Sequence, residues 1–293
     1  MKNKLSLFAV PYVGWMSIFV VAPIIIMVVY AFSTAAGDFT LENFARMGTY
    51  TAVFTRSFKL AIIATLIALL IGYPVSYMLS KEGPQVQRIA MVLIMLPMWM
   101  NFLLRTYSWM SILENNGLLN QLFQQIGLID LYNQIGMHFA SDPAAYVPID
   151  HFQMIGTQGA VVLGMVYNYL PFMILPIYSV LVKLDHSLIE AARDLGASSV
   201  QVFRKVILPL SLPGVLSGIT MVFVPSVSTF AISRLLGGGT QMMLGDLIEQ
   251  QFLGGAYNPQ LGAAIALVMM AIVVVCMLVM NRFGDGEEQA VML

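Results

Sequence analysis

Charge is what this sequence has least of. Only 10% of its 293 residues are charged and 59% are hydrophobic, with a mean hydropathy of +0.82. In soluble domains about a quarter of the residues are charged. A soluble fold of this length has too little interior to bury so much apolar surface, so the excess must face lipid. The net charge of −1 leaves no basic face for nucleic acid.

Several chemical motifs are also missing. The single cysteine, Cys276, excludes a disulfide within the chain. The phosphate-binding loop of P-loop ATPases is absent, as are His-Glu-x-x-His and Gly-x-Ser-x-Gly. The three histidines all fall in predicted loops. We therefore expect a chain that is not an enzyme and holds no metal or cofactor of its own.

Long apolar runs dominate what remains. A membrane-spanning helix needs about 20 mostly apolar residues. The runs are continuous and do not alternate, which favours helices over barrel strands. We predict an all-α polytopic membrane protein with a retained first span. The six predicted spans are residues 8–32, 58–79, 89–112, 160–182, 213–232 and 261–280. Apart from Lys59 at the edge of the second span, the only charge inside them is Arg105, which we expect to snorkel or to line a cavity.

The positive charges predict the orientation. With both termini in the cytoplasm, nine of the 14 Lys and Arg residues lie inside and five outside. Residues 113–158 contain no Lys or Arg and carry Glu114, Asp130, Asp142 and Asp150, so we place them outside. The acidic end of the chain is then a cytoplasmic tail.

Two loops have helical patterns. In the external loop, Leu118, Leu122 and Ile126 recur every four residues, which predicts a short amphipathic helix on the outer membrane surface. In the cytoplasmic loop, Asp185 or Ser187 can cap a helix that Gly196 ends.

That cytoplasmic loop carries a motif with fixed spacing. It reads Glu190-Ala191-Ala192-Arg193-Asp194-Leu195-Gly196, followed by Val206-Ile207-Leu208-Pro209. This resembles the EAA loop of ABC importer permeases, with Val206 where Ile is usual. An ordinary connector with a Gly cap would explain the Ala and Gly residues but not the spacing to Leu-Pro. The physical pattern favours a short docking helix, with Pro209 and Pro213 restarting the chain at the next span.

The resemblance implies the type I ABC importer permease fold, with a coupling helix that docks on an ATPase. It implies a heterodimer with a second permease, two ATPase subunits that bind ATP and Mg, and an extracytoplasmic binding protein. The coupling residues it implies are Glu190, Ala191, Ala192, Arg193, Asp194, Gly196 and Pro209. We therefore divide the chain into a first span with its external loop (1–57), a permease core (58–280) containing the coupling loop (183–209), and a cytoplasmic tail (281–293).

A narrower resemblance covers roughly residues 5–280. The stretches 102–109, 116–120, 170–176, 235–238 and 261–264 look like the B-type permease of spermidine/putrescine importers. Residues 132–151 form a longer stretch than is usual there, and Arg234 stands where an acidic residue is usual. The resemblance implies a bacterial plasma-membrane importer of polyamines.

A polyamine pathway needs oxygen acceptors and aromatic faces. The candidates are Tyr107, Trp109, Asn168, Tyr169, Ser226, Ser228, Thr229, Asp246 and Glu249. Each also has an ordinary interpretation. The aromatic residues can belong to the interfacial belt, the hydroxyls can satisfy helix carbonyls near Pro225, and the two acids can be solvated or face the binding protein. Gly214 and Gly218 can seat a neighbouring helix.

Three other functions remain open. The chain can be a permease for another small solute, such as an iron complex, an amino acid or an organophosphonate. It can be a channel or carrier that works without ATP, which predicts no dependence on an ATPase. An intramembrane enzyme requires a catalytic constellation, and none is found in the sequence.

Overall fold

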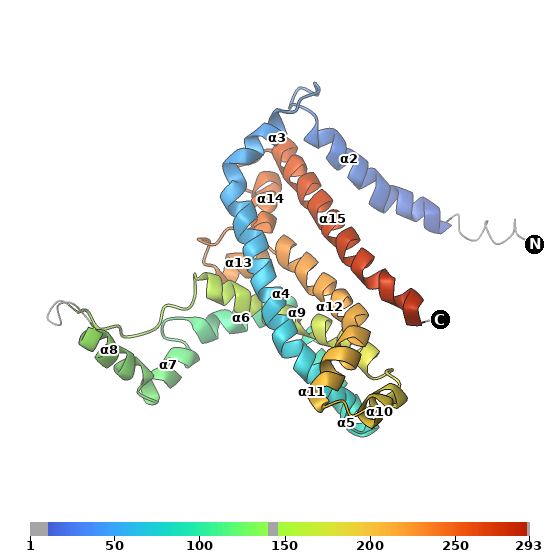
Figure 1. Ribbon diagram of the computed structural model, residues 1–293. Coiled ribbons are helices and arrows are strands. Elements are labelled where there is room, and N and C mark those ends of the chain that lie inside the picture. Colours follow the sequence, from blue (N-terminus) through green and yellow to red (C-terminus); the bar gives the residue numbers. More distant parts are fainter. Residues whose placement is uncertain (1–10, 140–145, 292–293) are drawn as a thin grey trace, which may run out of the picture.

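The computed structural model describes residues 11–139 and 146–291, which are almost entirely helical (Figure 1). Within these residues the only β-pairing is an isolated bridge between Ser33 and Phe39. The predicted all-α class is therefore confirmed. The α-helices are α2 (Ala22–Ala31), α3 (Glu42–Arg46), α4 (Thr51–Ser80), α5 (Pro84–Trp99), α6 (Phe102–Leu113), α7 (Leu118–Gln125), α8 (Leu128–Phe139), α9 (Gln158–Leu181), α10 (His186–Asp194), α11 (Ser199–Val202), α12 (Leu208–Ser228), α13 (Ala231–Leu236), α14 (Leu244–Leu253) and α15 (Pro259–Val291).

Five helical stretches of the described chain are long and apolar enough to cross a membrane, and a bent pair of helices can supply a sixth span. The five are Pro11–Ala31, Glu42–Ser80, Gln158–Leu181, Ser199–Ser228 and Pro259–Met280. The predicted start of the first span, residues 8–10, lies outside the described residues, as does Asp142. Helix α15 continues to Val291, so most of the predicted tail is helical.

The third predicted span, residues 89–112, is wrong as one continuous helix. Helices α5 and α6 meet at an angle of 90°. Met100 is extended, and the Asn101 side chain accepts hydrogen bonds from the backbone N–H groups of Leu103 and Leu104. An Asn that caps a new helix, placed just after Pro97, ends α5 and starts α6 in another direction.

The fifth predicted span, residues 213–232, also has different limits. Its helix begins at Ser199, passes through a π-helical turn at Phe203–Ile207 and ends at Ser228. Ile232 belongs to α13 instead. Pro209 therefore does not restart the chain as predicted. The wider π turn comes immediately before Pro209, where a regular helix would meet the clash of the proline ring with a carbonyl one turn back.

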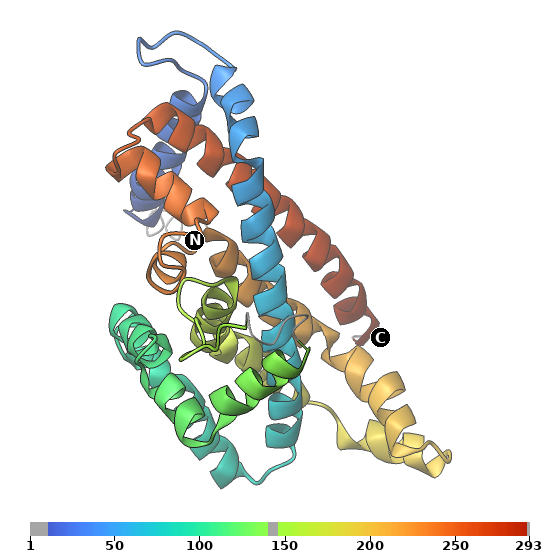
Figure 2. The ribbon, with the colours of Figure 1, turned by 90° about the vertical axis from the view of Figure 1, so that its left-hand side faces the viewer.

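Helices α4, α9 and α12 form the centre of the bundle (Figure 2). Small residues let them approach closely. A Cβ at Gly214 would lie 2.8 Å from the Pro176 carbonyl oxygen of α9, and one at Gly218 would lie 2.8 Å from the sulfur of Met173. The prediction that these two glycines seat a neighbouring helix is confirmed, and the helix is α9.

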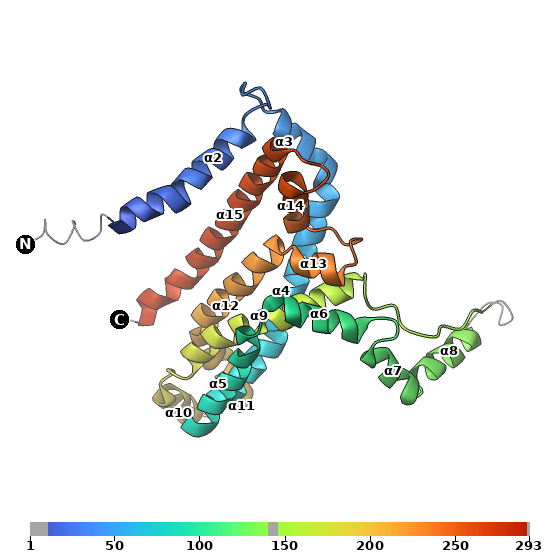
Figure 3. The same cartoon turned by 180° about the vertical axis from the view of Figure 1, so that it is seen from behind.

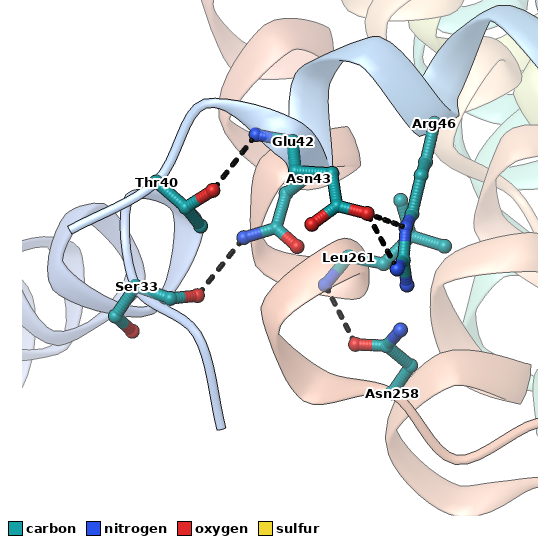
Figure 4. A network of polar contacts seen from close by, with 7 residues as sticks. All are labelled: Ser33, Thr40, Glu42, Asn43, Arg46, Asn258 and Leu261. Carbon is teal, nitrogen blue, oxygen red and sulfur yellow. Dashed lines mark hydrogen bonds and ion pairs between the residues drawn. The ribbon is translucent and has the colours of Figure 1, made fainter. Parts of the chain in front are cut away.

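Helices α2 and α15 lie antiparallel, side by side, and α3 covers one end of the pair. The Asn43 side chain of α3 donates a 3.0 Å hydrogen bond to the carbonyl oxygen of Ser33 (Figure 4) and another of 3.0 Å to that of Ala31. Glu42 and Arg46 form an exposed ion pair one turn apart on α3. These contacts fix the turn between the first two spans.

Helices α7 and α8 project sideways from the bundle (Figure 3). The predicted amphipathic helix is confirmed as α7, with Leu118 and Leu122 exposed on one side. Residues 149–152, which lead back to α9, are held by amide side chains. Asn120 bonds the backbone of Phe152, and Asn133 bonds that of Ile149. The position of α7 on a membrane surface stays a prediction.

Candidate functional site

The motif 190–196 folds as the end of a short capped helix, α10. The Asp185 carboxylate accepts a 2.9 Å hydrogen bond from the Ser187 backbone N–H, so Asp185 is the cap rather than Ser187. This hydrogen bond lowers the pKa of the Asp185 carboxyl from its usual value. At the other end Gly196 has a φ of +81°, as predicted for the residue that ends the helix.

The turn at Gly196 is a Schellman motif. The Gly196 N–H donates to the Arg193 carbonyl at 2.8 Å, and the Ala197 N–H donates to the Ala192 carbonyl at 3.1 Å. Only a left-handed residue allows both bonds, and glycine adopts that conformation without strain. The direction in which the chain leaves α10 therefore depends on one glycine.

Helix α10 presents two different sides. Glu190, Ala191 and Asp194 are exposed, whereas Ala192 is half-buried against the cluster formed by the ends of α4, α9 and α12. Leu195, the last residue before the turn, is 89% exposed and extends the exposed side of α10. A groove of about 340 Å³ runs beside it, lined by Ala192, Gly196 and the first residues of the next helix. The exposed side is small, acidic and available for docking.

The other two coupling candidates lie beside this side or beyond it. The Arg193 side chain is exposed and lines a pocket between α10 and the ends of the spans, and this pocket shares Val202 with the groove. Pro209 lies in α12, beyond the π turn. The structure thus brings six of the seven predicted residues to one helix and its C-terminal turn, five on α10 and Gly196 in the turn, while Pro209 belongs to the span that follows.

The candidate pathway residues of α6 face different ways. Tyr107 is 47% exposed on the outer side of the helix. Trp109 is partly buried against the core and packs edge-on against Tyr167, with ring centroids 5.3 Å apart. The two aromatic residues therefore do not form one surface.

The candidates of α9 and α12 are mostly buried. Asn168 donates a 2.8 Å hydrogen bond to the Gly164 carbonyl, and its side-chain oxygen has no partner among the described residues. Tyr169 packs between two core clusters. Ser226 and Ser228 donate to carbonyl groups of their own helix at 2.7 and 3.2 Å. Thr229 is buried where α12 ends. The two serines therefore fit the ordinary interpretation, in which hydroxyls satisfy helix carbonyls.

Asp246 is buried, so the interpretation of it as a solvated acid is wrong. Its carboxylate accepts a 2.5 Å hydrogen bond from the Ser233 hydroxyl and a 2.9 Å bond from the Met243 backbone N–H. Burial raises the pKa of this carboxyl, although the Ser233 bond opposes the shift. Asp246 thus caps α14 and joins it to α13.

The neighbouring charges are paired. Arg234 and Glu249 form an ion pair of 2.9 Å between α13 and α14. The arginine that departs from the usual pattern is therefore locally neutralised.

Arg105 is 8% exposed, and its Nε and Nη1 have no hydrogen-bond partner within the described chain. It is buried against its own chain and does not snorkel.

Sequence reasoning missed Ser233, the partner of Asp246. The signal was an acidic residue at the third position of a short helix, which is typical of a capping side chain. It also missed the grouping of Lys81, His186 and Arg193 around one pocket. No sequence signal reveals this group, because its members come from helices that meet only in the folded chain.

A family model described as "Binding-protein-dependent transport system inner membrane component" matches residues 64–286. The chain is 35% identical over 281 residues to the spermidine/putrescine transport system permease protein PotB of Escherichia coli K12, covering 93% of this chain and 95% of that protein. It is 35% identical over 285 residues to PotB of Haemophilus influenzae, covering 93% of each. It is 28% identical over 234 residues to the E. coli inner membrane ABC transporter permease protein YdcU, covering 79% of this chain and 71% of that protein.

Solved structures have the same fold. A bacterial ABC transporter that imports the acidic polysaccharide alginate matches with a TM-score of 0.75 and 16% identity, over 97% of this chain and 96% of that one. The MetNI methionine ABC transporter matches with a TM-score of 0.54 and 19% identity, over 84% of this chain and 98% of that one. At these identities the likeness concerns the fold alone.

Proposed function

Because this chain belongs to the family of binding-protein-dependent transport system inner membrane components, we propose that it is the permease through which an ABC importer moves spermidine and putrescine. The observation that carries the proposal is α10, a capped helix whose Glu-Ala-Ala motif is presented at one end of the spans. The identity to spermidine/putrescine permeases over 93% of the chain supports the substrate.

The proposed assembly contains this chain, a second permease, two ATPase subunits and an extracytoplasmic binding protein. The chain itself is a non-catalytic subunit, and the ATPase subunits bind ATP and Mg. Both termini and α10 lie in the cytoplasm, while α7 and α8 lie outside. The positive charges of the loops support this orientation.

The proposed cycle is alternating access. ATP closes the ATPase pair and moves the α10 helices docked on it, and the spans then change from inward-facing to outward-facing. The equilibrium between the two states shifts only because ATP binds them with different affinity. Substrate from the binding protein enters between the permeases and leaves to the cytoplasm after hydrolysis. Glu190 and Asp194 are free to meet cationic or amide partners on the ATPase.

Local charge agrees with a cationic substrate. A fixed, unpaired arginine in a water-filled pathway would repel a polyamine, but Arg234 is held by Glu249. The buried Asp246 stabilises the α13–α14 junction through its hydrogen bonds, and we assign it a positioning role. The remaining pathway candidates are Tyr107, Trp109, Asn168, Tyr169 and Thr229.

The test is reconstitution of the importer in lipid vesicles. We expect its ATPase activity to rise when the binding protein is loaded with spermidine or putrescine, and labelled polyamine to accumulate inside. Stimulation by an iron complex, an amino acid or an organophosphonate, with polyamines inert, would overturn the proposal that the substrate is a polyamine. Uptake that needs no ATPase would overturn the ABC function itself.

A further inference from the structure

A pocket of about 380 Å³ lies between α10 and the ends of two spans. The last residues of α4 form one wall with Tyr77, Ser80 and Lys81. Helix α10 forms the opposite wall with His186 and Arg193. These residues are far apart in the sequence, and the pocket exists only because α10 folds back under the bundle.

The pocket gathers positive charge that the chain does not neutralise. Lys81 and Arg193 line it, and neither forms an ion pair within the described residues. The Lys81 ammonium lies 3.8 Å from the centre of the Tyr77 ring, a cation–π contact that holds it at this wall. The described lining contains no carboxylate. Asp185 precedes His186 in sequence, but its carboxylate is engaged as the cap of α10.

Hydrogen-bond donors and apolar groups complete the lining. The hydroxyl of Ser199 and the imidazole of His186 can donate to an anion, whereas the Ser80 hydroxyl already donates to the Tyr77 carbonyl. Leu181, Leu184 and Ile189 supply an apolar wall beside them. A site that combines cations, hydroxyls and an apolar wall suits an anion attached to a hydrophobic body better than a free inorganic ion.

The position of the pocket, at the ends of two spans, indicates what this hydrophobic body is. The α4 helix ends at Ser80 and α9 ends at Leu181, so two membrane spans terminate at the pocket. The end of an apolar span marks the level of the lipid phosphates. Basic pockets between span ends are common binding sites for lipid head groups. The exposed side of α10, with Glu190, Asp194 and Leu195, is directed elsewhere and stays free for a protein partner.

We propose that this pocket binds the phosphate group of an anionic phospholipid, so that the lipid bridges α10 to the ends of α4 and α9. Lys81 and Arg193 pair with the phosphate, Ser199 and His186 donate hydrogen bonds, and the apolar wall contacts the glycerol region. The proposal rests on the proposed function only in placing α10 at the cytoplasmic leaflet. A lipid that holds α10 against the spans adjusts how firmly ATPase motion reaches them.

The test measures lipid binding to the full-length chain, so it requires neither polyamine nor partner subunits. The purified protein in neutral detergent is titrated with phosphatidylglycerol and followed by native mass spectrometry. The comparison probes are phosphatidylcholine and inorganic phosphate. We expect one phosphatidylglycerol to bind more tightly than phosphatidylcholine, and millimolar phosphate not to displace it. Lys81→Gln and Arg193→Gln should each weaken binding about fivefold, the effect of removing one positive charge next to a lipid phosphate.

Two further variants make the result specific. Lys183→Gln removes the same charge from an exposed neighbouring position outside the pocket, and it should leave phosphatidylglycerol affinity nearly unchanged. Ser199→Asp keeps all basic residues, adds a negative charge to the lining at the first turn of a helix where acids are tolerated, and should also weaken binding. Equal losses in Lys81→Gln and Lys183→Gln would show diffuse surface attraction and overturn the site. Equal binding of both lipids, or displacement by inorganic phosphate, would overturn the assignment to an anionic lipid.

Discussion

The replacement of Gly196 by valine tests the coupling loop most directly. Gly196 has a φ of +81°, and a Cβ built there meets no atom within 4 Å. The substitution therefore creates no steric clash with the rest of the molecule, and its effect comes from the backbone alone. A left-handed conformation costs a residue with a Cβ about 1–2 kcal/mol, and a β-branched residue lies at the upper end.

A strain of about 2 kcal/mol lowers the population of the native turn about 30-fold relative to alternatives that avoid the left-handed region. Those alternatives lose the bond from the Ala197 N–H to the Ala192 carbonyl and redirect the chain from Ala197 onward. The spans keep their own packing, so the protein should still fold and insert. Gly196→Val should therefore abolish uptake and weaken ATPase association, whereas Gly196→Asn, which tolerates this conformation, should keep most of both.

The assay compares uptake with the amount of ATPase that co-purifies with the permease. Gly83→Val is the matched control, because Gly83 lies in a loop at the end of α4, has a φ of −68° and also has no atom within 4 Å of a built Cβ. It should transport normally. Normal uptake and ATPase association in Gly196→Val would refute the role of the turn, and an equal loss in Gly83→Val would refute the argument from its conformation.

Three further predictions concern the bundle. Gly214→Ala should lower stability by about 1–3 kcal/mol, because its Cβ would meet a backbone oxygen of α9. Gly218→Ala should lower stability less, because the nearest atom is the sulfur of a flexible Met173 side chain. Thermal unfolding of the purified variants measures both losses, and the reverse order would contradict the packing argument. Burial raises the pKa of Asp246, so folding favours the protonated carboxyl. The protonated carboxyl contributes its full share to the free energy of unfolding below the ordinary pKa of 3.8, and this share is lost as the pH rises through the pKa of the folded state. Wild type should therefore gain stability relative to Asp246→Asn on acidification, and a constant difference across the acidic range would contradict this. In a chain whose Cys276 is replaced by serine, a cysteine in place of Asp150 should react with an impermeant maleimide in intact cells. Labelling only after permeabilisation would show that this loop lies in the cytoplasm and contradict the predicted topology.

Much of the fold could be predicted from local sequence alone. The apolar runs located the spans because every backbone group in lipid must bond within its own helix, so length and hydropathy suffice. The cap at Asp185 and the turn at Gly196 could be predicted because both depend on a few adjacent residues. The likeness to the EAA loop likewise rests on one continuous stretch.

The errors arose where the chain changes direction, because hydropathy measures how apolar a segment is and not which way its helix runs. Residues 89–112 are mostly apolar, yet Asn101 caps a new helix and the chain bends by 90°. Hydropathy averaged over the segment does not detect this cap. The prediction of a chain break at Pro209 failed for a related reason, since a π turn lets the helix continue past it.

Pairings between distant residues were beyond prediction. Asp246 reads as a surface acid because it lies in a polar stretch, and only the fold brings the Ser233 hydroxyl to it. The same holds for Arg234 and Glu249, which pair across two short helices. The burial of Asn168 and Ser226 likewise depends on helices that close around them.

The continuity of the helix Ser199–Ser228 has a mechanical consequence. Its 30 residues span about 45 Å at 1.5 Å per residue, from the turn that follows α10 to Thr229 at the other end. A tilt of a few degrees at the α10 end would displace the far end by several ångströms if the helix moved as a rigid rod about that end. The π turn at Phe203–Ile207 interrupts the regular helix close to its α10 end, and Pro213 and Pro225 interrupt it further along. The motion that reaches the far end therefore depends on how far the helix bends at these three places.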